Sequence, residues 1–153
     1  MIVRVLLLRS ASATRALGRK LGAVLQPGDF VALTGELGAG KTLFVKAVAE
    51  GAGAEAASSP SFTLANRYRG PVLLQHLDLY RVSSAGELFS LGFDDLIAEP
   101  AATLCEWADR APEAWPADRL EIAFEHAGPR SRKVRLRATG SRAENLLAAI
   151  VSL

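Results

Sequence analysis

The strongest chemical signal in the sequence is a glycine-rich segment at residues 35–42, which reads GELGAGKT. It matches the pattern G-x-x-x-x-G-K-[ST], in which backbone N–H groups surround the phosphates of a nucleotide. Its glycines permit backbone angles that other residues avoid, so successive N–H groups can turn toward one anion. Lys41 can reach the β- and γ-phosphates, and the Thr42 hydroxyl can ligate Mg²⁺. The segment therefore predicts binding of a nucleoside triphosphate with Mg²⁺.

The base of that nucleotide is expected to be adenine, because both motifs of guanine-nucleotide proteins are missing. Asp78 is followed by Leu-Tyr-Arg rather than by the remainder of D-x-x-G, and N-K-x-D does not occur. ATP is therefore the expected ligand. The predicted contacts in the loop and the first residues of the next helix are Glu36, Leu37, Gly38, Ala39, Gly40, Lys41, Thr42 and Leu43.

Two acidic residues follow strand-like runs of apolar sequence. Asp78 comes after residues 72–77, and Glu106 comes after residues 102–105. Ligands of α/β sheets bind beyond the carboxyl ends of the strands, and phosphate chemistry needs acids for the metal and the attacking water. We therefore expect Asp78, Glu106 and Lys41 to be the catalytic residues. The predicted ligands of Mg²⁺ are Thr42, Asp78 and Glu106.

Hydrophobic patterning indicates the elements that must position these residues. Residues 30–33 and 102–107 are typical of fully buried strands, and a helix expected at residues 41–50 is apolar on nearly all sides. Residues 62–69 and 72–80 resemble the two strands of a hairpin that turns at Gly70-Pro71. Three further strand-like runs occupy residues 2–8, 120–124 and 133–137.

Helical patterns alternate with these strands. Ser12 is expected to cap a first helix, and Gly92 is expected to interrupt a helical stretch at residues 87–97. Ser141 and Glu144 have the spacing of a capping box at the start of a last helix. The alternation predicts an α/β fold of the P-loop NTPase type. We expect one domain over residues 1–153, with three layers and a mixed, partly parallel central sheet flanked by helices.

Composition excludes several other classes of protein. Half of the 153 residues are hydrophobic and 22% are charged, which is not the composition of a disordered chain. Cys105 is the single cysteine, so no disulfide framework exists, and with two histidines it is too little for a structural zinc site. No apolar run is long enough for a membrane span, so we expect a cytoplasmic protein without membrane contact. The formal net charge of +2 does not decide whether nucleic acid binds.

Several residues have two interpretations. Lys133, Arg135 and Arg137 alternate with apolar residues. They form either the solvent face of an edge strand or a basic stripe that faces tRNA or a partner. His76 is expected to be a core histidine, and Trp107 a wholly or partly buried core residue rather than a ligand contact.

Five segments in order resemble the TsaE (YjeE) family of ATPases, which act in bacterial tRNA threonylcarbamoyladenosine biosynthesis. One of them is residues 87–93, ELFSLGF, which is similar to its E-L-x-x-x-G segment. Residues 35–42 are similar to its G-[DE]-L-G-A-G-K-T loop, and residues 59–64, SPSFTL, to its S-P-T-[FY]-T-L switch segment. Residues 76–81, HLDLYR, are similar to its H-x-D-L-Y-R stretch, and Glu106-Trp107 to its E-W pair. The ordered set is specific, whereas the loop alone occurs in many families.

The resemblance implies ATP with Mg²⁺, slow hydrolysis, and association with the TsaB–TsaD pair that transfers the threonylcarbamoyl group to tRNA. It implies that Lys41 holds phosphates, that Thr42 and Glu106 ligate the metal, and that Asp78 is the Walker-B-like acid. By this interpretation, tRNA is reached indirectly, through the partner complex, and direct contact with tRNA is left open.

The same resemblance implies a switch and a site for the base. The switch would comprise Ser59, Ser61 and Thr63; Ser61 replaces a threonine of the family but keeps the hydroxyl. The adenine end of the nucleotide would lie near Ala11 and Arg130.

The predicted function is an ATPase that is slow alone, is stimulated by partner proteins, and acts as a switch in tRNA modification. Two alternatives use the same loop: a small-molecule kinase, and a nucleotide-dependent binding module without turnover. Phosphate release without an acceptor distinguishes the ATPase from the kinase. ATP binding without turnover, even with partners, favours the binding module.

Overall fold

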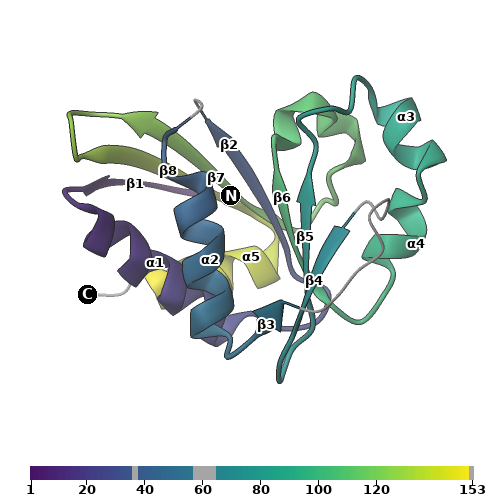
Figure 1. Ribbon diagram of the computed structural model, residues 1–153, viewed down its shortest axis with the longest axis horizontal. Helices are drawn as coiled ribbons and strands as arrows, with labels where there is room; N and C mark the ends of the chain where they lie inside the picture. The colour runs from purple at the N-terminus through teal and green to yellow at the C-terminus, as the bar shows by residue number, and fades with distance from the viewer. Residues whose placement is uncertain (36–37, 57–64, 152–153) are drawn as a thin grey trace.

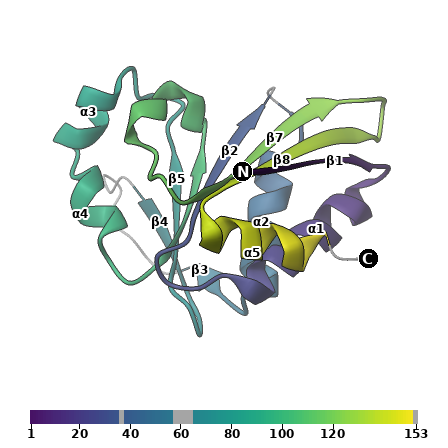
Figure 2. The same cartoon turned by 180° about the vertical axis from the view of Figure 1, so that it is seen from behind.

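The computed structural model describes residues 1–35, 38–56 and 65–151. The predicted loop contacts Glu36 and Leu37 and the predicted switch residues Ser59, Ser61 and Thr63 lie outside the described residues. The described strands form one eight-stranded sheet in the order β1-β8-β7-β2-β6-β5-β4-β3, with helices packed against it (Figures 1 and 2).

The bounds of the elements follow in chain order. The strands are β1 (Ile2–Leu8), β2 (Phe30–Gly35), β3 (Glu55–Ala56), β4 (Ala65–Arg69), β5 (Leu74–Asp78), β6 (Ala102–Glu106), β7 (Arg119–His126) and β8 (Arg132–Thr139). The α-helices are α1 (Ala11–Val24), α2 (Lys41–Gly51), α3 (Ala85–Ser90), α4 (Phe93–Ile97) and α5 (Ser141–Ile150). Two 3₁₀ turns, η1 (Ala108–Arg110) and η2 (Pro112–Ala114), follow β6.

The centre of the sheet is parallel and its two ends are antiparallel. Strand β2 runs parallel to both β6 and β7, and β5 runs parallel to β6. The pairs β1–β8, β7–β8, β4–β5 and β3–β4 are antiparallel. Parallel strands are normally buried on both faces, and every residue of β6 is buried here. This mixed, partly parallel sheet flanked by helices confirms the predicted fold class.

Most predicted elements are present, with small shifts at their ends. The two strands expected around Gly70-Pro71 pair in antiparallel register as β4 and β5. Gly92 separates α3 from α4, as expected, and has a φ of +89° that favours glycine. The short strand β3, which pairs with β4 at the edge of the sheet, was not predicted.

Both predicted helix caps were wrong. The cap of α1 is Ser10 rather than Ser12, and its hydroxyl accepts a hydrogen bond from the backbone N–H of Ala13 at 3.1 Å. Helix α5 has no capping box: the Asp118 carboxylate accepts from the N–H groups of Arg142 and Ala143, at 3.1 and 2.9 Å. The cap of α5 therefore comes from a residue that lies more than twenty positions earlier.

Helices cover the two faces of the sheet unequally. Helices α1, α2 and α5 pack against one face, where Leu33, Leu104 and Leu136 belong to the same hydrophobic cluster. Helices α3 and α4 and the turns after β6 cover the other face over β2, β6, β5 and the start of β4, around Phe30 and Leu77. Figures 1 and 2 show α3 and α4 at one end of the sheet and α1, α2 and α5 at the other. None of the described helices is long and apolar enough to cross a membrane.

Candidate nucleotide-binding site

The glycine-rich loop joins the end of β2 to the start of α2. Gly35 has a φ of +132°, and a Cβ there would lie 2.3 Å from the carbonyl oxygen of Phe124, so only glycine fits. Gly40 is the N-cap of α2 with a φ of +107°, and no described side chain caps this helix. The N–H groups in the first turn of a helix have no partner within it and attract anions. The first turn of α2 therefore offers backbone donors to an anion.

Lys41 is buried beside this loop, with only 5% of the residue exposed. Its Nζ donates a hydrogen bond to the carbonyl oxygen of Gly35 at 2.8 Å and lies 3.7 Å from the centroid of the Trp107 ring. Burial lowers the pKa of Lys41, and the negative charges of Glu106, Asp109 and Asp78 oppose this effect. The ammonium is thus partly shielded from solvent and lies near carboxylates, and a phosphate would be an additional partner for it.

Asp78 and Glu106 lie side by side at the carboxyl edge of the sheet. Asp78 is the last residue of β5 and Glu106 the last of β6, and the parallel register pairs the two. The prediction that both acids follow strands and meet at one edge is confirmed. Glu106 is buried, whereas Asp78 is exposed and accepts a hydrogen bond from the Tyr80 N–H at 3.0 Å.

His76 is largely buried, as expected of a core histidine, and it also contacts the site. Its Nε2 lies 2.6 Å from Oε2 of Glu106, and the side chains of both residues are largely buried. An ionised carboxylate can only accept, so the imidazole N–H donates to it. The Nδ1 of His76 is buried and has no hydrogen-bond partner among the described atoms. His76 therefore fixes the orientation of the Glu106 carboxylate.

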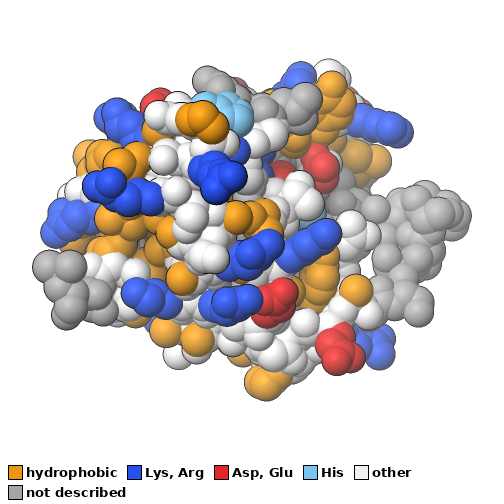
Figure 3. All heavy atoms as spheres, turned by 60° about the vertical axis from the view of Figure 1, so that its left-hand side comes forward, with side chains coloured by type: hydrophobic (Ala, Val, Ile, Leu, Met, Phe, Trp, Pro, Cys, Tyr) orange, Lys and Arg blue, Asp and Glu red, His pale blue; other side chains and the backbone are white. Residues whose placement is uncertain are grey.

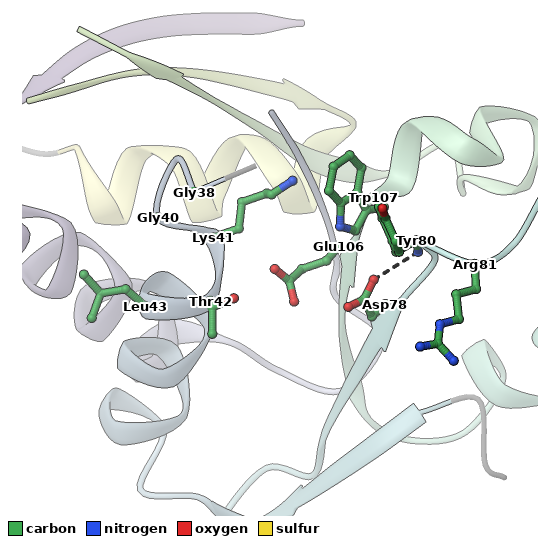
Figure 4. A pocket seen from close by; sticks show the side chains of 10 residues that line it. All are labelled: Gly38, Gly40, Lys41, Thr42, Leu43, Asp78, Tyr80, Arg81, Glu106 and Trp107. Atoms are coloured by element: carbon green, nitrogen blue, oxygen red, sulfur yellow. Dashed lines mark hydrogen bonds between the residues drawn. The ribbon is translucent and has the colours of Figure 1, made fainter. Parts of the chain in front are cut away.

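A cavity of about 690 Å³ opens between the loop and the two strand ends. In Figure 4, Lys41 and Thr42 lie on one side of it and Asp78 and Glu106 on the other. The cavity brings together seven of the predicted residues and three that were not predicted as ligand contacts. Its lining residues are Gly38, Gly40, Lys41, Thr42, Leu43, Asp78, Tyr80, Arg81, Glu106 and Trp107.

Trp107 is the most distinctive of the unpredicted lining residues. It packs partly against the core, as expected, but it also contacts Lys41 and has a φ of +56°. It is the one described non-glycine residue with a positive φ, and such backbone strain concentrates at functional sites. The Tyr80 ring lies 5.1 Å from the Trp107 ring. The position of Trp107 directly after Glu106 is the signal in the sequence that could have identified it.

A second cavity of about 310 Å³ adjoins the loop and contains both residues expected near the base. Ala11 and Arg130 line it together with Gly40 and Leu43, which also line the larger cavity. Arg132 lines it too, and its Nε donates to the carbonyl oxygen of Ala39 at 3.1 Å, a contact that sequence patterns did not reveal.

Not every predicted loop contact can act through its side chain. Ala39 is fully buried in the hydrophobic cluster under α1 and α2, so only its backbone is available to a ligand. The Thr42 side chain, by contrast, lies at the cavity and is exposed.

The residues at this site fit ATP and Mg²⁺. The volume lies in the range of ordinary small-molecule sites, and backbone donors and a lysine occupy one wall. No group of three or more His, Cys, Asp or Glu residues in the described part of the chain could hold a metal ion by itself. Mg²⁺ usually takes one or two carboxylates and completes its shell with water and substrate phosphates. Asp78, Glu106 and Thr42 match that requirement.

The fold and the site together define a class: α/β proteins in which a glycine-rich loop leads from a central strand into a buried helix. The family model described as "Threonylcarbamoyl adenosine biosynthesis protein TsaE" matches residues 8–134. The chain belongs to the TsaE family, which works in tRNA threonylcarbamoyladenosine biosynthesis.

Individual relatives agree with this assignment. The tRNA threonylcarbamoyladenosine biosynthesis protein TsaE of Bacillus subtilis (strain 168) is 39% identical over 135 residues, which are 87% of this chain and 84% of the relative. The TsaE of Treponema pallidum (strain Nichols) is 35% identical over 127 residues, 82% of this chain and 94% of its own. The crystal structure of Bacillus subtilis YdiB matches with a TM-score of 0.80 at 34% identity, covering 98% of this chain and 96% of that one. The family resemblance predicted from the motifs is confirmed.

Proposed function

We propose that this chain is a cytoplasmic, Mg²⁺-dependent ATPase that acts as a partner-coupled switch in tRNA threonylcarbamoyladenosine modification. The observation that carries the ATPase part is the buried Lys41, which faces Glu106 and Asp78 across one cavity below a glycine-rich loop. Membership of the TsaE family supports the pathway.

Each residue has a distinct role in this proposal. Lys41 would exchange its contact with the Gly35 carbonyl for the β- and γ-phosphates, a charge-assisted interaction. Thr42, Asp78 and Glu106 would hold Mg²⁺. When bound, the metal would neutralise charge that develops on the phosphates. Glu106, held by His76, would also orient the attacking water.

The base would occupy the adjoining cavity. Ala11 offers a small apolar contact at the start of α1, and Arg130 offers a planar cation that can stack on a base. Because Gly40 and Leu43 line both cavities, one nucleotide can extend from the base site to the phosphate site.

The proposal that partner proteins stimulate the chain rests on its family membership and not on the geometry of the cavity. In this proposal the chain hydrolyses ATP slowly alone and faster when bound to a TsaB–TsaD-type pair, through which it acts on tRNA. Phosphate release should therefore be measured with and without that pair and without any acceptor. Fast hydrolysis alone that the pair does not change would contradict the switch, and transfer to a small acceptor would favour a kinase.

Lys41→Ala tests the nucleotide site directly. Loss of the phosphate-binding cation should weaken Mg-ATP binding by about 100-fold, or about 2.7 kcal/mol, in calorimetry. Lys46→Ala is a matched control, because Lys46 lies on the same helix with its side chain exposed. Equal affinities for the Lys41 variant and the wild type would refute the site.

A further inference from the structure

No helix in the described part of the chain covers one face of the half of the sheet formed by β7, β8 and β1, and that face has a regular chemical pattern. On the edge strand β1, Val3, Val5 and Leu7 point outward and are 41%, 50% and 51% exposed. The register places them opposite three cations of β8: Val3 faces Arg137, Val5 faces Arg135, and Leu7 faces Lys133. An apolar row therefore runs directly beside a basic row. We call these two rows the β1–β8 face.

The next strand supplies carboxylates at the two ends of the basic row but not at its centre. Glu121 lies opposite Arg137 and Glu125 opposite Lys133, whereas Ala123 lies opposite Arg135. Among the described residues no carboxylate lies within ion-pair distance of Arg135. Arg135 is thus an exposed guanidinium between two apolar neighbours, with no acidic partner from the described part of its own chain.

The same side of the sheet is covered elsewhere. Ala32 of β2 pairs with Glu121 of β7, so both are on one side of the sheet, and Ala32 is buried under the helices of the other half. Beyond β2 none of the described helices continues that layer. A hollow of about 310 Å³ remains there, lined by residues that include Val3, Thr34, Ala123 and Arg135. Apolar side chains that lie together on an exposed surface mark interaction sites, and an element docked here would bury Val3, Val5 and Leu7.

The charges and the side-chain types decide which element fits. A helix with an apolar stripe would cover Val3, Val5 and Leu7, and carboxylates beside that stripe would pair with Arg135 and its neighbours. Single-stranded RNA fits less well, because this face has no aromatic side chain on which bases stack. A second copy in a symmetric contact would bring the two basic rows together, which like charges disfavour.

We propose that the β1–β8 face is a docking surface for an amphipathic, acidic helix of a partner protein. This inference rests on the partner coupling of the proposed function and adds the surface and the chemistry of its occupant. It places docking on side chains that line neither cavity of the proposed nucleotide site, although Arg132 of β8 lines the base cavity, so partner binding and ATP binding can be disturbed separately.

The test measures affinity for a purified TsaB–TsaD-type pair with two variants of this face. Arg135→Glu reverses the central charge, and Val5→Asp places a charge in the apolar row; each should weaken binding at least about tenfold. Lys20→Glu is the matched control, because Lys20 is exposed on α1. The Lys20 control tests whether loss of positive charge alone weakens binding, since Lys and Arg side chains are spread over the side of the molecule that Figure 3 shows. Melting temperature and ATP affinity should stay at wild-type values in Arg135→Glu and Lys20→Glu.

Three results are informative. Weak binding by both face variants, with normal binding by the control, supports the docking surface. If Val5→Asp destabilises β1, the result for Arg135→Glu alone is used. Normal binding by Arg135→Glu and Val5→Asp overturns the inference but leaves the proposed function intact. If the wild-type chain does not bind the pair at all, the partner coupling and the docking surface are both wrong, whereas ATP binding still stands on the Lys41 experiment.

Discussion

The two halves of the sheet differ in what covers them, and this difference is visible in their strands. In β6, between β2 and β5, all five residues are buried. In β8, buried Val134, Leu136 and Ala138 alternate with exposed Lys133, Arg135 and Arg137. Helices cover both faces around β6 but one face of β8. The continuous burial of β6 therefore indicates a strand covered on both faces, and the alternation in β8 indicates a strand with one face in solvent.

The contrast also separates two kinds of polar chemistry. In the half covered on both faces, the acidic residues Asp78 and Glu106 end their strands and line a cavity beside the glycine-rich loop. In the other half, charges lie along the strands and face outward. The first arrangement suits one small ligand in a cavity, and the second suits a broad contact with another surface. Three pairs of substitutions test how far this separation holds.

The largest effect is expected at the strand end of the doubly covered half. Glu106→Gln should lower ATP turnover about 10³-fold, because the carboxylate that orients water is lost. ATP affinity should change much less, since the loop backbone and Lys41 remain. Glu125→Gln, on an exposed strand carboxylate of the other half, should leave turnover unchanged. Steady-state phosphate release from both variants would show whether catalysis depends on one half only; near wild-type turnover in Glu106→Gln would remove that residue from the site.

An intermediate effect is expected on stability. Leu104 of β6 is 1% exposed and Val5 of β1 is 50% exposed. Leu104→Ala should lower the free energy of unfolding by about 3 kcal/mol, because it leaves a cavity in a packed core. Val5→Ala should change it by less than about 0.5 kcal/mol, because the side chain is half exposed. Urea denaturation measures both; a large loss in Val5→Ala would mean that the open face is packed in solution.

The smallest effect is expected where the open half joins α5. Asp118→Ala removes the carboxylate that caps this helix and should cost about 1 kcal/mol, or about 2–4 °C in melting temperature. Ser141→Ala should have no measurable effect, because no side-chain cap from Ser141 is present. The melting temperatures of the two variants distinguish the two caps. A larger loss in Ser141→Ala than in Asp118→Ala would support the capping box predicted from the sequence.

Local patterns were enough to predict much of the site. The glycine-rich loop, the strand before it and the apolar helix after it are adjacent in sequence, so their residue types report the geometry directly. Asp78 and Glu106 could be assigned because each directly follows a buried run. Gly92 could be predicted to interrupt the helical stretch because a positive φ depends on the residue type at that one position. The ordered motifs, moreover, were enough to identify the family before any strand was placed.

Contacts between distant parts of the chain could not be predicted in this way. His76 and Glu106 are 30 positions apart, Asp118 and Ala143 are 25 apart, and Arg132 and Ala39 are 93 apart. Each contact depends on which strands are neighbours, and hydrophobic periodicity does not contain the order of strands in a sheet. The same holds for the open face: alternation in residues 133–137 shows that one side of the strand is solvated. Only the position of β8 between β1 and β7 places Val5 and Ala123 on either side of Arg135.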